Sequence, residues 1–188
     1  MRSRGETPRA LRPPTSDLRD APLTIAYDQH AAVAQRAAEA GIVLLKNERN
    51  LLPLAASSKR IVVIGGNADV GVLSGGGSSQ VRSVGGAPIE IPLAYGAAAS
   101  FVRITYHASS PLAALREALP GVQIDYLDGR NFNATVEAAK TADLAIVFAT
   151  QWTTEAEDAP DLRLPDHQDA LIAAIAGVQP KTVAVMET

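Results

Sequence analysis

Three acidic side chains stand close together after the most apolar run of the chain. Glu155, Glu157 and Asp158 follow residues 144–150, whose composition predicts a buried strand. A carboxyl group just beyond a strand end is well placed for general acid/base chemistry, because the strand fixes the backbone that carries it. A solvated acidic loop is the other interpretation, and spacing alone favours it. Arg163 lies nearby and suits an ion pair with one of these acids.

A glycine-serine cluster is the second candidate feature. It reads Gly75-Gly-Gly-Ser-Ser79 and follows the apolar run 60–64. Glycine-rich loops after strands can hold phosphate, but the Gly-Lys-Ser/Thr ending of a P-loop is absent here. Gly65-Gly66 does not extend to a dinucleotide-binding fingerprint either. A structural turn and a loop that lines a substrate site remain as interpretations.

Composition removes several classes of function. The 188 residues carry a net charge of −3 and only 4% aromatic side chains, which argues against a nucleic-acid partner. There is no cysteine, and His30, His107 and His167 lack metal-ligand spacing, so neither a metal nor a cofactor is expected. No apolar run approaches the ~20 residues of a membrane span. The N-terminal residues lack the apolar region of a secretory signal, and the compartment stays unknown.

Strands and helices alternate along the chain and must position these features. This order predicts an α/β fold: a three-layer α/β/α sandwich around a mostly parallel sheet. Sites in such sheets form beyond the carboxyl ends of the strands, which favours the loops 65–92 and 151–165. We expect a long loop over 66–100 and helix caps at Asp28, Ser110, Asn133 and Asp166. Strands are predicted at 60–64, 122–126, 144–150 and 182–186, and helices at 30–46, 109–118, 133–140 and 166–176.

Domain boundaries follow from changes in composition. Residues 1–27 are rich in Arg and Pro and are predicted to be a disordered or remnant segment. Residues 28–58 are predicted to form a linker-like helix and an apolar clamp, and residues 59–188 the α/β domain. The chain ends directly after a strand of the buried type, so we expect this domain to be incomplete at its C-terminus.

Four motifs, in this order, resemble the second domain of family 3 glycoside hydrolases of the β-glucosidase type. The first resembles the segment that joins the two domains of the family, and the second the strand after it. The third resembles the family's glycine-serine loop, and the fourth the segment that holds its general acid/base glutamate. The motifs are Glu39-Ala-Gly-Ile-Val-Leu-Leu-Lys with Leu51-Leu-Pro-Leu, Ile61-Val-Val-Ile-Gly-Gly-Asn-Ala-Asp, Gly75-Gly-Gly-Ser-Ser-Gln-Val, and Glu155-Ala-Glu-Asp-Ala-Pro-Asp-Leu-Arg-Leu-Pro.

The resemblance implies a role for particular residues. It places the acid/base glutamate at Glu155, with Glu157 and Asp158 as competitors. Ala156 stands where the family often has Gly, and Ala159 where it commonly has Arg. The resemblance also implies that Gly76, Gly77, Ser78 and Ser79 line the sugar site. The serine hydroxyls would bond to sugar hydroxyls or to the loop's own backbone.

The implied activity is that of a fragment of a retaining β-glycosidase acting on terminal β-D-glucosyl residues of a β-glucoside or oligosaccharide. The family's nucleophilic aspartate belongs to a preceding (β/α)8 barrel domain, which we expect to be missing from this chain. The chain alone is then expected to be inactive, with Glu155 titrating like an ordinary exposed glutamate. The alternatives are a non-catalytic α/β binding or scaffold domain and, more weakly, a nucleotide-binding protein.

Overall fold

The computed structural model describes residues 25–54, 57–94, 96 and 99–188, and the chain divides into two compact units, Met1–Val43 and Leu44–Thr188. In the first unit, helix α1 spans Tyr27–Gly41 and has no buried residue. Its N-cap is Ala26, so the predicted cap at Asp28 is wrong. Asp28 lies within the first turn, where its charge suits the helix dipole. The predicted continuation to residue 46 is also wrong, because the helix ends at Gly41 and Ile42 is extended.

The second unit is built on a four-stranded sheet in which all neighbouring strands are parallel. The strand order is β5-β1-β6-β7, with β5 spanning Gln123–Leu127, β1 Arg60–Ile64, β6 Leu144–Thr150 and β7 Thr182–Glu187. β1 reads Arg-Ile-Val-Val-Ile and β6 is apolar almost throughout, as expected for strands covered on both faces. The predicted α/β fold is confirmed.

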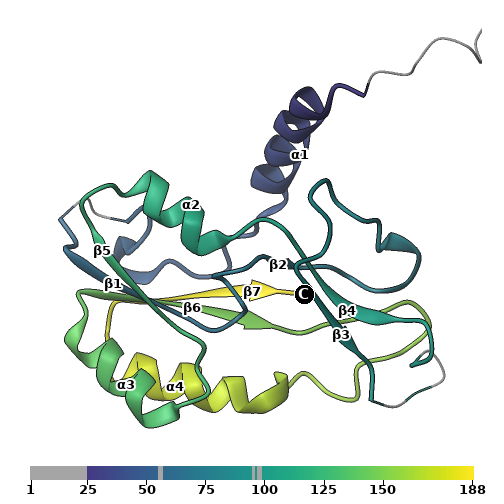
Figure 1. Ribbon diagram of the computed structural model, residues 1–188. Helices are drawn as coiled ribbons and strands as arrows, with labels where there is room; N and C mark the ends of the chain where they lie inside the picture. The colour runs from purple at the N-terminus through teal and green to yellow at the C-terminus, as the bar shows by residue number, and fades with distance from the viewer. Residues whose placement is uncertain (1–24, 55–56, 95, 97–98) are drawn as a thin grey trace, which may run out of the picture. The chain divides into compact units, whose positions relative to one another are not determined.

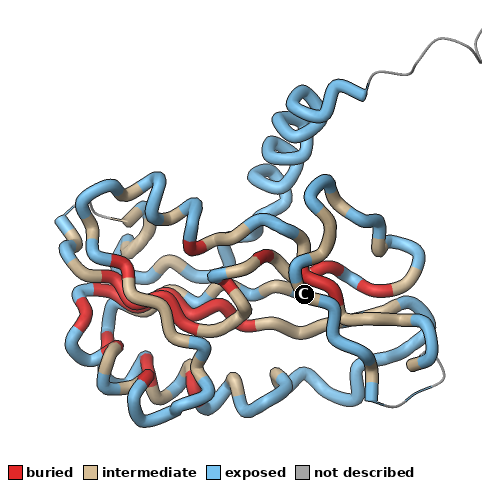
Figure 2. Tube along the Cα trace, viewed as in Figure 1, coloured by how far each residue is buried: buried red, intermediate tan, exposed pale blue. Residues whose placement is uncertain are grey.

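Helices cover both faces of this sheet (Figure 1). α2 (Pro111–Ala118) lies on one face, and α3 (Phe132–Thr141) and α4 (Gln168–Val178) lie on the other. The residues of β1 alternate between the two resulting cores. Ile61 and Val63 pack in the core with Leu112 of α2, and Val62 and Ile64 pack in the core that includes residues of α3 and α4. Figure 2 shows the buried residues concentrated in the strands of the central sheet.

A small antiparallel sheet is inserted between β1 and α2. Its order is β2-β4-β3, with β2 at Val72–Leu73, β4 at Arg103–His107 and β3 at Ile89–Pro92. The prediction of a long loop over 66–100 is therefore wrong. β2 and β3 are short and flanked by glycines, so they form strands only because β4 pairs with both of them.

Helix starts agree only in part with the sequence. Ser110 caps α2 as predicted, since its side chain accepts a hydrogen bond from the Ala113 amide. The cap of α3 is Asn131 rather than Asn133, because the Asn131 side chain reaches the amide of Ala134. Asp166 caps nothing: it lies in the 3-10 turn Pro165–His167, and α4 begins at Gln168.

The strand order has a consequence for the position of a site. From β1 the chain passes to β5 on one side, then returns across β1 to β6 and β7 on the other side. The strand order thus reverses between β1 and β6. The connection that leaves β1 runs to one side of this point, and the connection that leaves β6 runs to the other side. Open α/β sheets bind ligands in the crevice at the carboxyl ends of such strands.

Candidate active site

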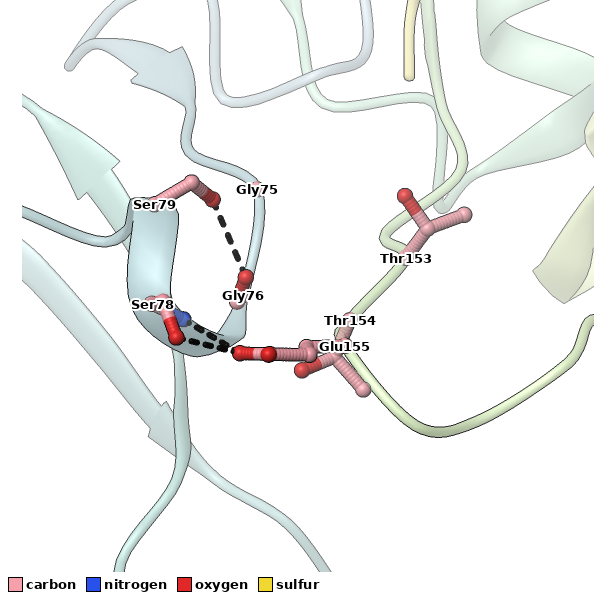
Figure 3. Close-up of a pocket in the computed structure, with 7 residues that line it drawn as sticks. All are labelled: Gly75, Gly76, Ser78, Ser79, Thr153, Thr154 and Glu155. Atoms are coloured by element: carbon pink, nitrogen blue, oxygen red, sulfur yellow. Dashed lines mark hydrogen bonds between the residues drawn. The ribbon is translucent and has the colours of Figure 1, made fainter.

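Two loops at the carboxyl end of the sheet meet at a shallow pocket (Figure 3). One is the glycine-serine loop that follows β2, and the other is the segment that follows β6. The pocket has a volume of about 360 Å³. Its lining residues are Gly75, Gly76, Ser78, Ser79, Thr153, Thr154 and Glu155.

Glu155 is held across this pocket by one residue. Its Oε2 accepts a hydrogen bond from the Ser78 amide at 2.9 Å and another from the Ser78 hydroxyl at 2.5 Å. Both bonds hold the pKa of the exposed Glu155 carboxyl below its usual value, because they favour the charged form. The bond from the Ser78 hydroxyl has the larger effect and the bond from the amide the smaller. The expectation that Glu155 titrates like an ordinary glutamate is therefore wrong.

Glycine is required where the two loops touch. A Cβ on Gly76 would lie 2.5 Å from Thr154 Oγ1 and 2.6 Å from a ring carbon of Trp152. At Gly77, φ is +74° and a Cβ would lie 2.4 Å from the Glu155 Cβ. Any side chain at these positions would push the loops apart, so these glycines let Ser78 approach Glu155. The backbone also pairs here, with the Gly76 amide donating to the Thr153 carbonyl at 2.9 Å.

Each loop is anchored to the sheet by a polar side chain. The Gln168 side chain accepts from the Thr150 amide and donates to the Thr150 carbonyl, both at 2.9 Å, and so joins the two ends of the segment that carries Glu155. Glu187, at the end of β7, accepts from the Leu73 amide at 3.0 Å and fixes the start of the glycine-serine loop. Burial raises the pKa of the Glu187 carboxyl, and the bond from Leu73 opposes that shift.

The other predicted site residues have different surroundings. The Ser79 hydroxyl donates to the Gly76 carbonyl within its own loop, at 3.0 Å. Gly77 touches Glu155 but does not line the pocket, and neither do the competitor acids Glu157 and Asp158. Glu157 pairs instead with Thr154 in an isolated antiparallel bridge.

Arg163 makes an ion pair, but not with any of the three candidate acids. Its partner is Asp161, two residues earlier in the exposed part of the same segment. This pair lowers the pKa of the Asp161 carboxyl, chiefly through the hydrogen bond from the Arg163 side chain. Arg163 therefore does not bond to Glu155. Among the described residues, Ser78 alone donates hydrogen bonds to the Glu155 carboxylate.

Sequence reasoning missed part of the pocket wall. Thr153 and Thr154 line the pocket, and Trp152 packs against Gly76 with its indole Nε1 buried and unpaired among the described residues. Their position between the end of β6 and Glu155 is the signal that could have identified them. Glu187 was missed as well, because no local pattern links it to Leu73.

The chemistry open to this arrangement is proton transfer. Glu155 is the one carboxylate among the lining residues, and it faces hydroxyl and amide groups. Retaining glycoside hydrolysis needs a second carboxylate at ~5–5.5 Å, and the lining set has none. Among the described residues, no group of three potential ligand side chains is placed to hold a metal ion. No helix in the described part of the chain is long and apolar enough to span a membrane.

The fold and the pocket together define an α/β domain that presents one carboxylate beside a glycine-serine loop. The family described as "Glycosyl hydrolase family 3 C-terminal domain" matches residues 42–188. The chain therefore belongs to glycoside hydrolase family 3, as the sequence motifs predicted.

Relatives and solved structures agree with this assignment. Thermostable beta-glucosidase B of Acetivibrio thermocellus is 32% identical over 164 residues, which are 85% of this chain and 20% of that protein. A probable beta-D-xylosidase 6 of Arabidopsis thaliana is 30% identical and covers 87% of this chain and 19% of its own length. The structure of a Bifidobacterium adolescentis beta-glucosidase superposes with a TM-score of 0.63 at 27% identity, over 90% of this chain and 23% of that one. The chain spans about a fifth of the length of the curated relatives it matches.

Proposed function

We propose that this domain supplies the general acid/base half of a retaining β-glycosidase site, with Glu155 as the proton donor and acceptor. The substrate would be a β-glucoside or oligosaccharide with a terminal β-D-glucosyl residue. The nucleophile would come from a (β/α)8 barrel domain, and the site would form where the two domains meet. One observation carries the proposal: Glu155 is the carboxylate of the pocket formed by the segment after β6 and the glycine-serine loop.

The names of the relatives support a sugar substrate but leave its identity as a proposal. They include both beta-glucosidases and beta-D-xylosidases. We favour the glucoside because beta-glucosidases are found among both the sequence relatives and the solved structures.

A proton donor at neutral pH needs a raised pKa, whereas Ser78 lowers the pKa of Glu155. Our proposal therefore requires that a barrel docked over the pocket excludes water from Glu155, because desolvation favours the neutral carboxyl. The same observation favours the alternative function, a non-catalytic binding or scaffold domain, since an exposed and ionised Glu155 is a poor acid.

The test uses the domain joined to, or mixed with, a nucleophile-bearing barrel of the family. We expect Glu155→Ala to slow the glycosylation step far more for alkyl glucosides than for glucosides with good phenolic leaving groups. Phenolic leaving groups need little protonation. Azide should restore the second step, because a small anion attacks without a general base. The chain alone should give no turnover.

Glu157→Ala is the matched control, because its carboxylate lies in the same segment but outside the pocket. It should leave the ratio between the two substrate classes unchanged. If Glu157→Ala slows alkyl glucosides far more than phenolic ones and Glu155→Ala does not, the assignment of the acid is wrong. If neither substitution changes hydrolysis, the scaffold alternative holds.

A further inference from the structure

We propose that Ser78 is a positioning residue for Glu155 rather than a ligand of the sugar: its amide and hydroxyl both hold Oε2, so that Oε1 is the oxygen that gives and takes the proton. This inference rests on the proposed function of Glu155. It gives Ser78 a different role from the one that the sequence resemblance implied.

The hydrogen bonds distinguish the two oxygens of the carboxylate. Oε2 accepts from two donors of Ser78, at 2.9 Å from the amide and 2.5 Å from the hydroxyl (Figure 3). None of the described residues donates a hydrogen bond to Oε1. A proton on Oε2 would displace one of these donors, whereas a proton on Oε1 would displace nothing. Oε1 is therefore the favoured site of protonation.

The same bonds limit Ser78 as a sugar ligand. A serine hydroxyl has one hydrogen to donate, and Ser78 uses it on Glu155, so towards a sugar it could only accept. Ser79 differs from Ser78 although it is adjacent in sequence, because its hydroxyl donates to the Gly76 carbonyl at 3.0 Å. Gly77 has a φ of +74°, and a Cβ there would lie 2.4 Å from the Glu155 Cβ, so glycine allows the close approach that brings Ser78 to the carboxylate. The two serines thus form a matched pair.

The contact has opposite consequences for the two steps of a retaining cycle. In the first step, the nucleophile of the barrel bonds to the anomeric carbon, the glycosidic bond breaks, and the proton on Oε1 moves to the leaving oxygen. In the second step, water bonds to the anomeric carbon, the bond to the nucleophile breaks, and Oε1 takes a proton from the water, which restores the acid. Donors on Oε2 stabilise the carboxylate, so they lower the fraction of Glu155 that is protonated for the first step. They keep Glu155 ionised for the second step, but they also make it a weaker base. Ser78 would set the balance between them.

The first experiment follows the titration of the Glu155 side-chain carboxyl by NMR in the full 188-residue chain. In Ser78→Ala the pKa of Glu155 should move upward, because the stronger of the two bonds is lost. Ser78→Thr keeps a hydroxyl and should retain the lowered pKa, and Ser79→Ala should leave it unchanged. If Ser78→Ala causes no shift, or if Ser79→Ala causes the same one, the proposal is overturned.

A second experiment separates positioning from sugar binding in the domain combined with a family barrel. A positioning role predicts that Ser78→Ala moves the pH profile of kcat/KM and leaves KM at the optimum unchanged, with rescue by Ser78→Thr. A raised KM with an unchanged pH profile would identify Ser78 as a sugar ligand and reject the inference. The NMR result does not depend on activity. If the pKa of Glu155 shifts in Ser78→Ala alone while Glu155→Ala leaves hydrolysis by the combined domains unchanged, the proposed function is rejected. That pair of results would still support the contact between Ser78 and Glu155.

Discussion

The central sheet and the two loops at its carboxyl edge are held together by different physical means. In β1, Val62 and Val63 are completely buried, and each packs in a different hydrophobic core. At the pocket, Glu155 and Ser78 are exposed and are joined by two hydrogen bonds. Burial on both faces makes the sheet depend on side-chain volume, whereas the loops depend on a few directional contacts.

This difference separates the residues that stabilise the domain from those that could act in it. A change in the sheet alters the free energy of unfolding of the whole domain, because both cores include residues of β1. A change in a loop alters the geometry around Glu155 and leaves the cores intact. Function and stability can therefore be changed separately, and the following substitutions test how far that separation holds.

The largest effect is expected from Ile64→Ala in β1. Ile64 is fully buried in the core beside α3 and α4, so truncation leaves a cavity and should lower the free energy of unfolding by about 2–5 kcal/mol. Urea unfolding at equilibrium measures this loss. Val81→Ala is the control, because Val81 is 73% exposed and its truncation should cost less than about 0.5 kcal/mol. Similar losses for the two variants would contradict the comparison.

Gly77→Ala should affect the pocket more than the fold. Alanine at φ of +74° is strained by about 1–3 kcal/mol, and its Cβ would collide with Glu155. Gly86→Ala is a matched control, because Gly86 has φ of +81° but no atom within 4 Å of an added Cβ. Both variants should lose the stability that the strained φ costs, and Gly77→Ala should lose more because of the collision, but only Gly77→Ala should shift the NMR signals of Glu155 and the Ser78 amide. Equal shifts in the two variants would show that strain alone disturbs the site.

The smallest effect is expected from Glu187→Gln, as a change in the pH dependence of stability. Burial raises the pKa of Glu187 in the folded chain, so its contribution to stability is complete below the pKa of the unfolded chain. That contribution is lost as the pH rises through the raised folded value. Glutamine does not ionise and its amide oxygen can still accept from Leu73, so this loss should disappear.

Urea midpoints between about pH 4 and pH 8 measure this change. The control is Glu117→Gln, on the exposed surface of α2, which should leave the pH profile as it is. A steeper loss of stability with rising pH in Glu187→Gln would contradict the assignment, and so would a profile identical to that of the unchanged chain.

Local sequence patterns determined the elements of the parallel sheet and the region of the candidate site. The apolar runs of β1 and β6 are long enough and rich enough in β-branched residues to predict buried strands without knowledge of their partners. The acids after β6 and the glycines that follow β1 could be placed at the carboxyl edge for the same reason, because parallel strands share that edge.

Only the tertiary structure decided which of these residues meet. Ser78 and Glu155 are 77 residues apart in the chain, and Leu73 and Glu187 are 114 apart. β2 and β3 form strands because β4 pairs with them. The pattern of their own residues is too weak to predict either strand. Periodicity reports the environment of a segment within a few residues. The contact that lowers the pKa of Glu155 depends instead on close backbone approach at Gly76 and Gly77. The burial that raises the pKa of Glu187 depends on the strand order that places β7 in the sheet.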